Sequence, residues 1–239
     1  MPSRSRMSGA GHGPRRRPNQ RSRVTRTTLI RTAERLFAGR GIAAVSLNEI
    51  SKAAGQRNSN ACQYHFGDKQ GLLQAILDKH VPGIADERAV LLRRRDRSRT
   101  GHGLRELVQV FVRPLAARLQ SDDGGPEFIR INAQLIALHA LAVAGIPASP
   151  LRVASADPFF RQLRRALRAT GLPATLVQQR LMLAAVLIFH GLDDHARMFD
   201  SCGRQREAAT RLFTANLEDS VVALLTAPAS AAARAACRP

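Results

Sequence analysis

The chain has 239 residues, enough for one small module and a second domain with a sizeable apolar core. Its hydrophobic content of 44% is ordinary for a soluble globular protein, which argues against a fibrous or disordered chain. The formal net charge of +19 favours a polyanionic partner, either nucleic acid or an anionic membrane surface, although an Arg-rich composition also results from GC-rich coding.

Neither the cysteines nor the apolar runs predict an exported or membrane protein. Cys62, Cys202 and Cys237 are widely spaced and include no CxxC pair, which fits a reducing cytoplasm. The first residues are polar and rich in Arg, so no signal peptide is expected. The longest strongly apolar run, residues 181–189, is well short of the roughly 18 residues that span a bilayer. A soluble, cytoplasmic protein without a membrane partner is therefore predicted.

Residues 1–24 combine Gly, Pro, Ser and Arg without apolar periodicity, which predicts a disordered basic arm. Two interpretations are equally open: a phosphate-tracking extension beside a DNA-binding domain, and a solvated leader without a contact. The charge of the arm comes from Arg4, Arg6, Arg15, Arg16, Arg17, Arg21 and Arg23.

The next elements have the signals of two helices. Apolar residues from Leu29 to Phe37 follow the spacing of an amphipathic helix, and Gly39 and Gly41 are suited to close it. A capping box formed by Ser46 and the Glu three positions later begins a second helix, which ends at a glycine at position 55.

Two further helices follow in the same region. A short third helix is predicted from Asn58 to His65 and is broken by Gly67. A fourth begins near Lys69, and the Pro-Gly pair at residues 82–83 is expected to kink or end it.

The rest of the chain alternates apolar helical segments with Pro and Gly, and it lacks the alternating β-branched pattern of strands. The predicted fold class is all-α: a three-helix helix-turn-helix domain at residues 25–71 and a helical domain at residues 72–226, followed by a flexible tail at 227–239. The helices expected in the second domain cover residues 104–120, 127–144, 158–170, 174–199 and 207–225.

The polar third helix is the feature that indicates function. The first two helices form a small core that can present the third to the major groove of DNA, which is wide enough to admit a helix. Asn and Gln can pair with adenine edges, and Arg can pair with guanine. A core helix would not bury so many polar groups, so this segment must face a polar surface.

The residues around these helices resemble the TetR family of bacterial regulators. The matching segments read Leu-Ile-Arg-Thr-Ala-Glu-Arg-Leu-Phe at 29–37, Gly-Ile at 41–42, Val-Ser-Leu-Asn-Glu-Ile at 45–50, Ala-Ala-Gly at 53–55, Tyr-His-Phe-Gly-Asp-Lys at 64–69 and Leu-Leu at 72–73. Between Gly55 and Phe66 the chain is one residue longer than the commonest pattern and resembles the subset with Gly-Gln-Arg-Asn before Tyr-His-Phe-Gly. The register of the base-reading residues is therefore left open.

The resemblance implies roles for individual residues. Ser46, Tyr64 and Lys69 would contact phosphate, and His65 would pack or contact the backbone beside them. The residues implied to face base edges or neighbouring phosphates are Arg57, Asn58, Ser59, Asn60 and Gln63. The implied supporting core consists of Phe37, Leu47, Ile50, Ala53 and Phe66. For each polar residue the alternative is a solvated helix face or a helix cap.

For the second domain, the resemblance implies a homodimer, formed when the helices at 174–199 and 207–225 pair with their twins, and a pocket for a small-molecule effector. Binding of the effector would shift the fourth helix and release the dimer from a palindromic operator, as in a repressor. The low aromatic content favours an apolar or amphipathic effector of unknown identity. The candidate lining residues are Phe111, Phe128, Leu135, His139, Phe159, Phe160, Phe189 and His190.

Other chemistry has weaker signals. Cys62 fits a redox sensor, but burial as a small apolar residue is favoured. The cluster of His190, Asp193, Asp194 and His195 lacks a third metal ligand at a set spacing, so no metal and no cofactor are predicted. No P-loop, GxSxG, HExxH or GxGxxG occurs, which disfavours the alternative of an all-α enzyme. A second alternative is a non-specific nucleic-acid-binding protein that depends on the basic arm.

Overall fold

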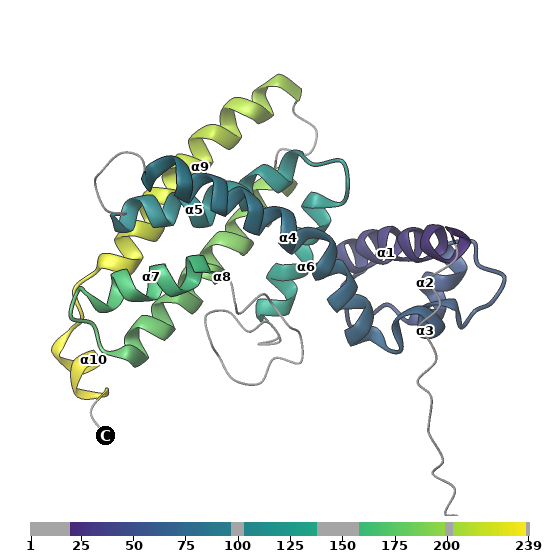
Figure 1. The fold of residues 1–239 in the computed structure, drawn as a ribbon, viewed down its shortest axis with the longest axis horizontal. Coiled ribbons are helices and arrows are strands. Elements are labelled where there is room, and N and C mark those ends of the chain that lie inside the picture. The colour runs from purple at the N-terminus through teal and green to yellow at the C-terminus, as the bar shows by residue number, and fades with distance from the viewer. Residues whose placement is uncertain (1–19, 97–102, 138–157, 199–202, 238–239) are drawn as a thin grey trace, which may run out of the picture.

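The computed structural model describes residues 20–96, 103–137, 158–198 and 203–237, and every element within these ranges is helical. Figure 1 shows two parts: a small group of helices, α1 to α3, at one end, and a larger helical bundle at the other, with α4 running from one to the other. The predicted all-α class is confirmed. The small part consists of α1 (Gln20–Arg40), α2 (Leu47–Ala53) and α3 (Ala61–Phe66).

Helix α1 supplies the base of the small domain. Leu29, Ala33 and Phe37 are fully buried, as their spacing predicted, and Gly41 ends the helix with φ +90° while its N–H donates to the Phe37 carbonyl at 3.0 Å. The helix begins at Gln20, so the last residues of the predicted disordered arm are helical. Residues 1–19 of that arm lie outside the described ranges.

The capping box at the start of α2 is present. The Glu49 N–H donates to the Ser46 hydroxyl oxygen at 3.2 Å, and the Ser46 N–H donates to the Glu49 carboxylate at 2.8 Å. This reciprocal pair satisfies two amides that have no partner inside the helix. Arg40, at the end of α1, donates to the same carboxylate at 3.0 Å and so joins the two helices.

Helix α4 (Lys69–Asp96) is longer than predicted, because the chain continues helically through Pro82. A kink or an end of the helix was predicted at Pro82, and the predicted end is wrong, because the helix continues past it. Pro82 and Asp78, whose carbonyl would accept a hydrogen bond from the missing N–H, are both exposed, so water can satisfy that carbonyl. One helix therefore belongs to both parts of the molecule.

The bundle contains α5 (Leu104–Ala117), the 3₁₀ turn η1 (Arg118–Gln120), α6 (Gly125–Ala137), α7 (Pro158–Arg168), α8 (Ala174–Met198) and α9 (Gly203–Thr226). These agree with the five predicted segments within the described residues. Helices α6 and α9 each pack on α8, and α5 packs on α9. A further short helix, α10 (Ala231–Ala235), lies where a flexible tail was predicted.

Helix α8 is the central helix of this bundle. By length and composition alone it is apolar enough to cross a membrane, which the shorter run at residues 181–189 did not suggest. Leu181, Ala185 and Ile188, however, are buried against the rest of the bundle. A core helix of a soluble protein has the same composition, so this feature is weak evidence of a membrane span.

A buried charged cluster joins the small domain to the bundle. Glu34 of α1, with a side chain that is 2% exposed, accepts from Lys79 Nζ at 2.8 Å, and its other oxygen lies 2.8 Å from His80 Nε2. Lys79 also pairs with Asp123, which precedes α6, at 3.2 Å, and Arg31 reaches the same Asp123 at 3.1 Å. Three segments far apart in the sequence therefore meet in one charged cluster.

Two close contacts of α6 complete this junction. Gln134 accepts from the Ile42 N–H at 2.9 Å and donates to the Phe37 carbonyl at 3.1 Å, so one amide group holds both backbone groups at the end of α1. Gly124, with φ +78°, allows close approach, because a Cβ there would lie 2.5 Å from a Glu34 oxygen. The small domain is thereby attached to α6 as well as to α4.

We expect Glu34→Gln to lower the free energy of unfolding by about 3 kcal/mol, because it keeps the volume but leaves the mostly buried Lys79 ammonium without its main partner. Urea denaturation followed by circular dichroism measures this change. Glu207→Gln is the matched control, since it removes the acid of an exposed ion pair with Arg211 and should change the same quantity by less than about 0.5 kcal/mol. Equal effects of the two substitutions would contradict the central role of Glu34.

A second expectation concerns pH. Hydrogen bonds from the Ser46 N–H and hydroxyl, and then from Arg40, lower the pKa of Glu49 from 4.5 to about 2. Because this pKa is depressed in the folded state, the charged carboxylate stabilises the fold above pH 4.5, and that contribution is lost as the pH falls towards 2.

The difference in melting temperature between the native chain and Glu49→Gln should therefore shrink between these two pH values. In a Ser46→Ala background this pH dependence should become smaller but persist, because the backbone N–H at position 46 and Arg40 still donate to Glu49. A difference that stays constant with pH would show that the capping box does not hold Glu49 ionised.

Candidate nucleic-acid interface

The turn between α2 and α3 places a run of polar residues on the surface. Gly55 adopts φ +68°, which reverses the chain after α2. The Asn58 side-chain oxygen then accepts from the Asn60 N–H at 2.9 Å, a local bond that favours a turn over a helix. The third helix consequently begins at Ala61, three residues later than predicted, and Asn58, Ser59 and Asn60 precede it.

Helix α3 is held in place by its buried side. Ala61 and Cys62 are buried, and the Cys62 N–H donates to the hydroxyl of the fully buried Ser51 at 3.0 Å. Ser51 in turn donates to the Leu47 carbonyl at 3.0 Å. Burial raises the pKa of the Cys62 thiol, which disfavours a reactive thiolate and supports the structural role predicted for this residue.

The opposite side of α3 is open to solvent. Tyr64 is 83% exposed, and Gln63 beside it is also exposed. The Tyr64 ring lies edge-on to His65 at a centroid distance of 5.2 Å. An aromatic side chain so exposed gains nothing from the core, so its position leaves it available to a partner.

His65 and Phe66 end α3 and face the first turns of α1. The guanidinium of Arg26 lies 5.1 Å from the centre of the Phe66 ring. Burial, and then the nearby charge of Arg26, lowers the pKa of His65, so this imidazole is neutral at pH 7. It can therefore donate or accept a hydrogen bond without adding charge.

Lys69 has a structural partner that its sequence position did not reveal. Its Nζ donates to the Ile42 carbonyl at 2.9 Å and approaches the Ala43 carbonyl at 3.5 Å. The side chain is half-buried and ties the start of α4 to the loop between α1 and α2. An ammonium has three donors, so Nζ can bond these carbonyls and still donate to a further acceptor.

The structure thus brings the sequence-predicted polar residues to one region. Those that are exposed are Ser46, Arg57, Asn58, Ser59, Asn60, Gln63 and Tyr64. Of the predicted supporting core, Phe37 and Ile50 are buried and Leu47 and Phe66 are half-buried, but Ala53 is exposed, because it lies on the outer side of the last turn of α2. Sequence reasoning missed Ser51 and Arg26, whose partners are known only from the packing of the helices.

The candidate effector residues divide into separate groups in the bundle. Phe111, Phe159 and Phe160 form one cluster, with ring centroids 5.1 to 5.6 Å apart. Phe128 lies instead against His80 at the domain junction, 4.6 Å between centroids. Leu135 and Phe189 are buried, His190 is half-buried, and His139 lies outside the described residues.

A buried arginine that the sequence did not single out joins the phenylalanine cluster. The guanidinium of Arg88, on α4, lies 5.0 to 5.4 Å from the centres of the three rings. Arg88 is only 6% exposed, so it brings a positive charge into an aromatic environment. This part of the bundle is therefore both apolar and charged.

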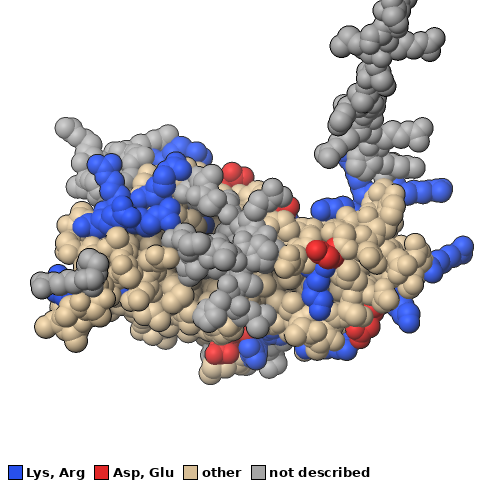
Figure 2. All heavy atoms as spheres, turned by 90° about the horizontal axis from the view of Figure 1, so that it is seen from below, with Lys and Arg blue, Asp and Glu red and all other residues tan. Residues whose placement is uncertain are grey.

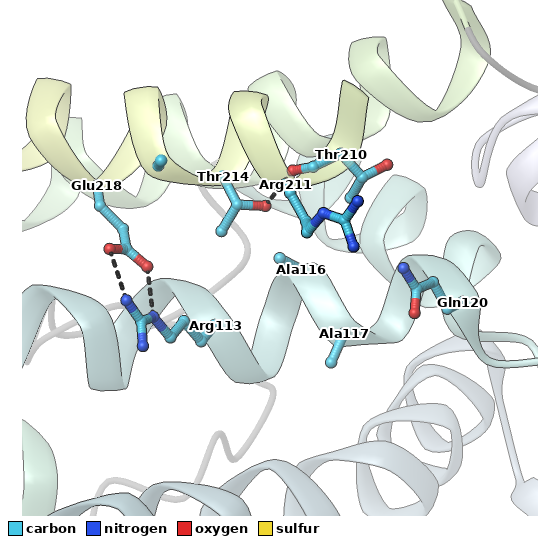
Figure 3. Close-up of a pocket in the computed structure, with 9 residues that line it drawn as sticks. Arg113, Ala116, Ala117, Gln120, Thr210, Arg211, Thr214 and Glu218 are labelled. Carbon is cyan, nitrogen blue, oxygen red and sulfur yellow. Dashed lines mark hydrogen bonds and ion pairs between the residues drawn. The ribbon is translucent and has the colours of Figure 1, made fainter. Parts of the chain in front are cut away.

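Two cavities in the described part of the chain are lined by residues other than the candidate effector residues. One, of about 300 Å³, lies between α5 and α9, where Arg113 pairs with Glu218 at 2.7 Å and Thr214 donates to the Thr210 carbonyl at 2.7 Å (Figure 3). The other, of about 360 Å³, lies at the domain junction between α1 and the start of α6.

The cluster of possible metal ligands on α8 is engaged in other contacts. Asp193 is buried and binds Arg130 at 2.7 Å and also Arg197. The ring of His195 stacks on Phe213 at a centroid distance of 4.3 Å, and its Nε2 lies 3.0 Å from the Thr210 hydroxyl. Among the residues with described positions, no three His, Cys, Asp or Glu side chains are grouped to hold a metal ion.

Part of the sequence is similar to known bacterial regulators. The sequence profile of the bacterial regulatory proteins of the tetR family matches residues 29–76. The chain is 40% identical over 63 residues to the HTH-type transcriptional regulator TtgR of Pseudomonas putida, a match that covers 26% of this chain and 30% of that protein. It is 35% identical over 71 residues to the HTH-type transcriptional regulator AcrR of Shigella flexneri, covering 30% and 33%.

These matches span about a third of the length of the curated relatives. The profile match, residues 29–76, falls on the helices α1 to α4. Among solved structures, the TetR family transcriptional regulator PfmR of Thermus thermophilus is similar over 81% of this chain and 96% of that chain, with 21% identity and a TM-score of 0.46. The profile covers the capped second helix, the turn and the polar third helix described above. The match to the tetR family of bacterial regulatory proteins thus lies in the small domain and the first turns of α4.

Proposed function

We propose that this protein is a cytoplasmic transcriptional regulator that binds duplex operator DNA through α3 and the turn before it. The observation that carries the proposal is the two-sided nature of this segment. One side is anchored by Cys62 and Ser51, while Gln63 and Tyr64 and the polar turn project into solvent. A rigid helix with an exposed polar face is what reading of the major groove requires.

The exposed side chains suit two kinds of contact with DNA. Gln63 and Asn60 have amides that can pair with adenine, and Arg57 can pair with guanine. Tyr64 and Ser46 have hydroxyls that can donate to phosphate oxygens. Contacts to phosphate would position α3, and contacts to base edges would provide the sequence preference.

The surface of α8 and α9 supports a homodimer. Leu183 on α8 is 50% exposed and Leu212 on α9 is 74% exposed, and Met198 at the end of α8 is 73% exposed. These three side chains would be covered if α8 and α9 paired with the same helices of a second copy. A dimer through these helices would present two copies of α3 to a palindromic site.

In this proposal a small-molecule effector binds near Phe111, Phe159 and Phe160, at a place distinct from the two cavities described above. Arg88 in the same cluster favours an amphipathic effector over a purely apolar one. A ligand there would contact α4, which continues into the junction at Lys79 and His80. If movement of α4 changes the spacing of the two copies of α3, effector binding would release the dimer from its operator and end repression.

The first test of this proposal uses Tyr64→Phe. Loss of one hydroxyl bond to a charged acceptor should weaken binding to every duplex by about tenfold, whatever its sequence. The dependence on salt should be unchanged, because no charge is lost. Fluorescence anisotropy with a duplex selected from random DNA, and with an unrelated duplex, measures both effects.

Deletion of residues 1–19 is the control for the alternative, a non-specific protein that depends on its basic arm. On our proposal the shortened chain keeps its sequence preference. If it loses all binding while Tyr64→Phe binds normally, the arm and not α3 is the DNA-binding element.

The second test uses Gln63→Ala. Loss of a bidentate contact should reduce discrimination at one base pair by about tenfold and leave the other positions unchanged. Repeated selection from random DNA with the variant measures the preference at each position. Gln120, in the bundle, is also exposed, so Gln120→Ala is the matched control and should reproduce the native preference. An unaltered preference in Gln63→Ala would exclude this residue from base reading.

A further inference from the structure

Helix α7 has an arginine face that the proposed function does not use. Its sequence, PFFRQLRRALR, contains four arginines and no acidic residue. Arg161, Arg165 and Arg168 are exposed, and Arg164 between them is half-buried. Positions 161, 165 and 168 follow the i, i+4, i+7 spacing, so these three side chains share one side of the helix.

The other side of α7 fixes this face in place. Phe159, Leu163 and Leu167 are all fully buried in the bundle. Within the described ranges, no ion pair or hydrogen bond engages the guanidinium groups of Arg164, Arg165 or Arg168. Several positive charges are therefore held close together on a rigid surface, where like charges repel each other and an anionic partner would relieve the repulsion.

This face lies far from α3. In Figure 1, α7 lies in the part of the bundle opposite the small domain, and Figure 2 shows Lys and Arg side chains gathered at that end of the molecule. A duplex bound along α3 at one end is thus not the natural partner of α7 at the other. The two basic regions are separate surfaces.

We infer that the arginine face of α7, defined as Arg161, Arg164, Arg165 and Arg168, binds the phosphate backbone of a second DNA duplex without sequence preference. The guanidinium fork matches phosphate geometry in two-point hydrogen bonds. From 161 to 168 the helix rises about 10 Å, a length over which one strand of B-DNA carries about three phosphates.

The buried side of α7 distinguishes this partner from an anionic membrane. A helix that lies in a bilayer surface inserts its apolar side among the acyl chains. Here Phe159, Leu163 and Leu167 belong to the protein core and are not free to insert. What α7 offers a partner is charge alone, which is the basis of non-specific DNA binding.

The inference goes beyond operator recognition, because it makes the protein a bridge between two DNA segments. It is tested with beads carrying one unlabelled duplex, the full-length protein, and a second fluorescent duplex of random sequence free in solution. The triple variant Arg161→Gln, Arg165→Gln and Arg168→Gln should retain at least fivefold less of the fluorescent duplex than the native chain. Its binding to a single selected duplex in anisotropy should stay within about twofold, since α3 is unchanged.

The matched control replaces Arg93, Arg94 and Arg105 with Gln. These arginines are also exposed and lie on other helices. Because three arginines are replaced in each variant, the two variants have the same net charge. It should bridge as well as the native chain. Circular dichroism spectra and melting temperatures verify that both variants are folded.

Two results would overturn the inference. One is that the native chain does not bridge the two duplexes, and the other is that the α7 variant bridges them as well as the control variant does. Flotation with vesicles containing phosphatidylglycerol distinguishes a DNA partner from an anionic membrane. If the native chain binds these vesicles through α7 and does not bridge DNA, the partner is a membrane and the inference is wrong. Failure of operator recognition would show separately, as absence of any preferred sequence in the selection.

Discussion

The buried carboxylate of Glu34 is the contact on which the arrangement of the two parts depends. A charge removed from water is tolerated only when close partners compensate it, and here Lys79 and His80 supply them at 2.8 Å each. Both partners lie on α4, and Lys79 continues to Asp123 beside α6. The pairing specifies one position of α1 relative to the bundle, because a displaced helix would leave an uncompensated buried charge.

This junction determines how α3 is presented. Helix α2 packs on α1, and α3 packs on α2 and α4. Gln134 of α6 holds both the end of α1 and the loop that follows it. Lys69 fastens that loop to the start of α4. A change in α4 or α6 would therefore act on the end of α1 and the loop that follows it through these hydrogen bonds, and α4 also contacts α3 directly.

Helices α3 and α7 each have a buried side, which fixes the position of the exposed side. Apolar side chains anchor α3 and α7 from beneath, so polar and charged groups on both helices stand out rigidly. The two surfaces differ in chemistry: amides and hydroxyls surround Tyr64, whereas α7 displays guanidinium groups. The first suits discrimination between base pairs, and the second suits uniform attraction to phosphate.

Local signals in the sequence determined the helices of the small domain, because periodicity, the Ser46 capping box and the turn glycines act over three or four residues. They also located the exposed face around Gln63 and Tyr64. Only the tertiary structure decided which residues meet across the chain: Gln134 binds Ile42, 92 positions away, and Phe128 packs on His80 and not with Phe111. Such pairings depend on how whole helices pack, and no short-range pattern encodes them.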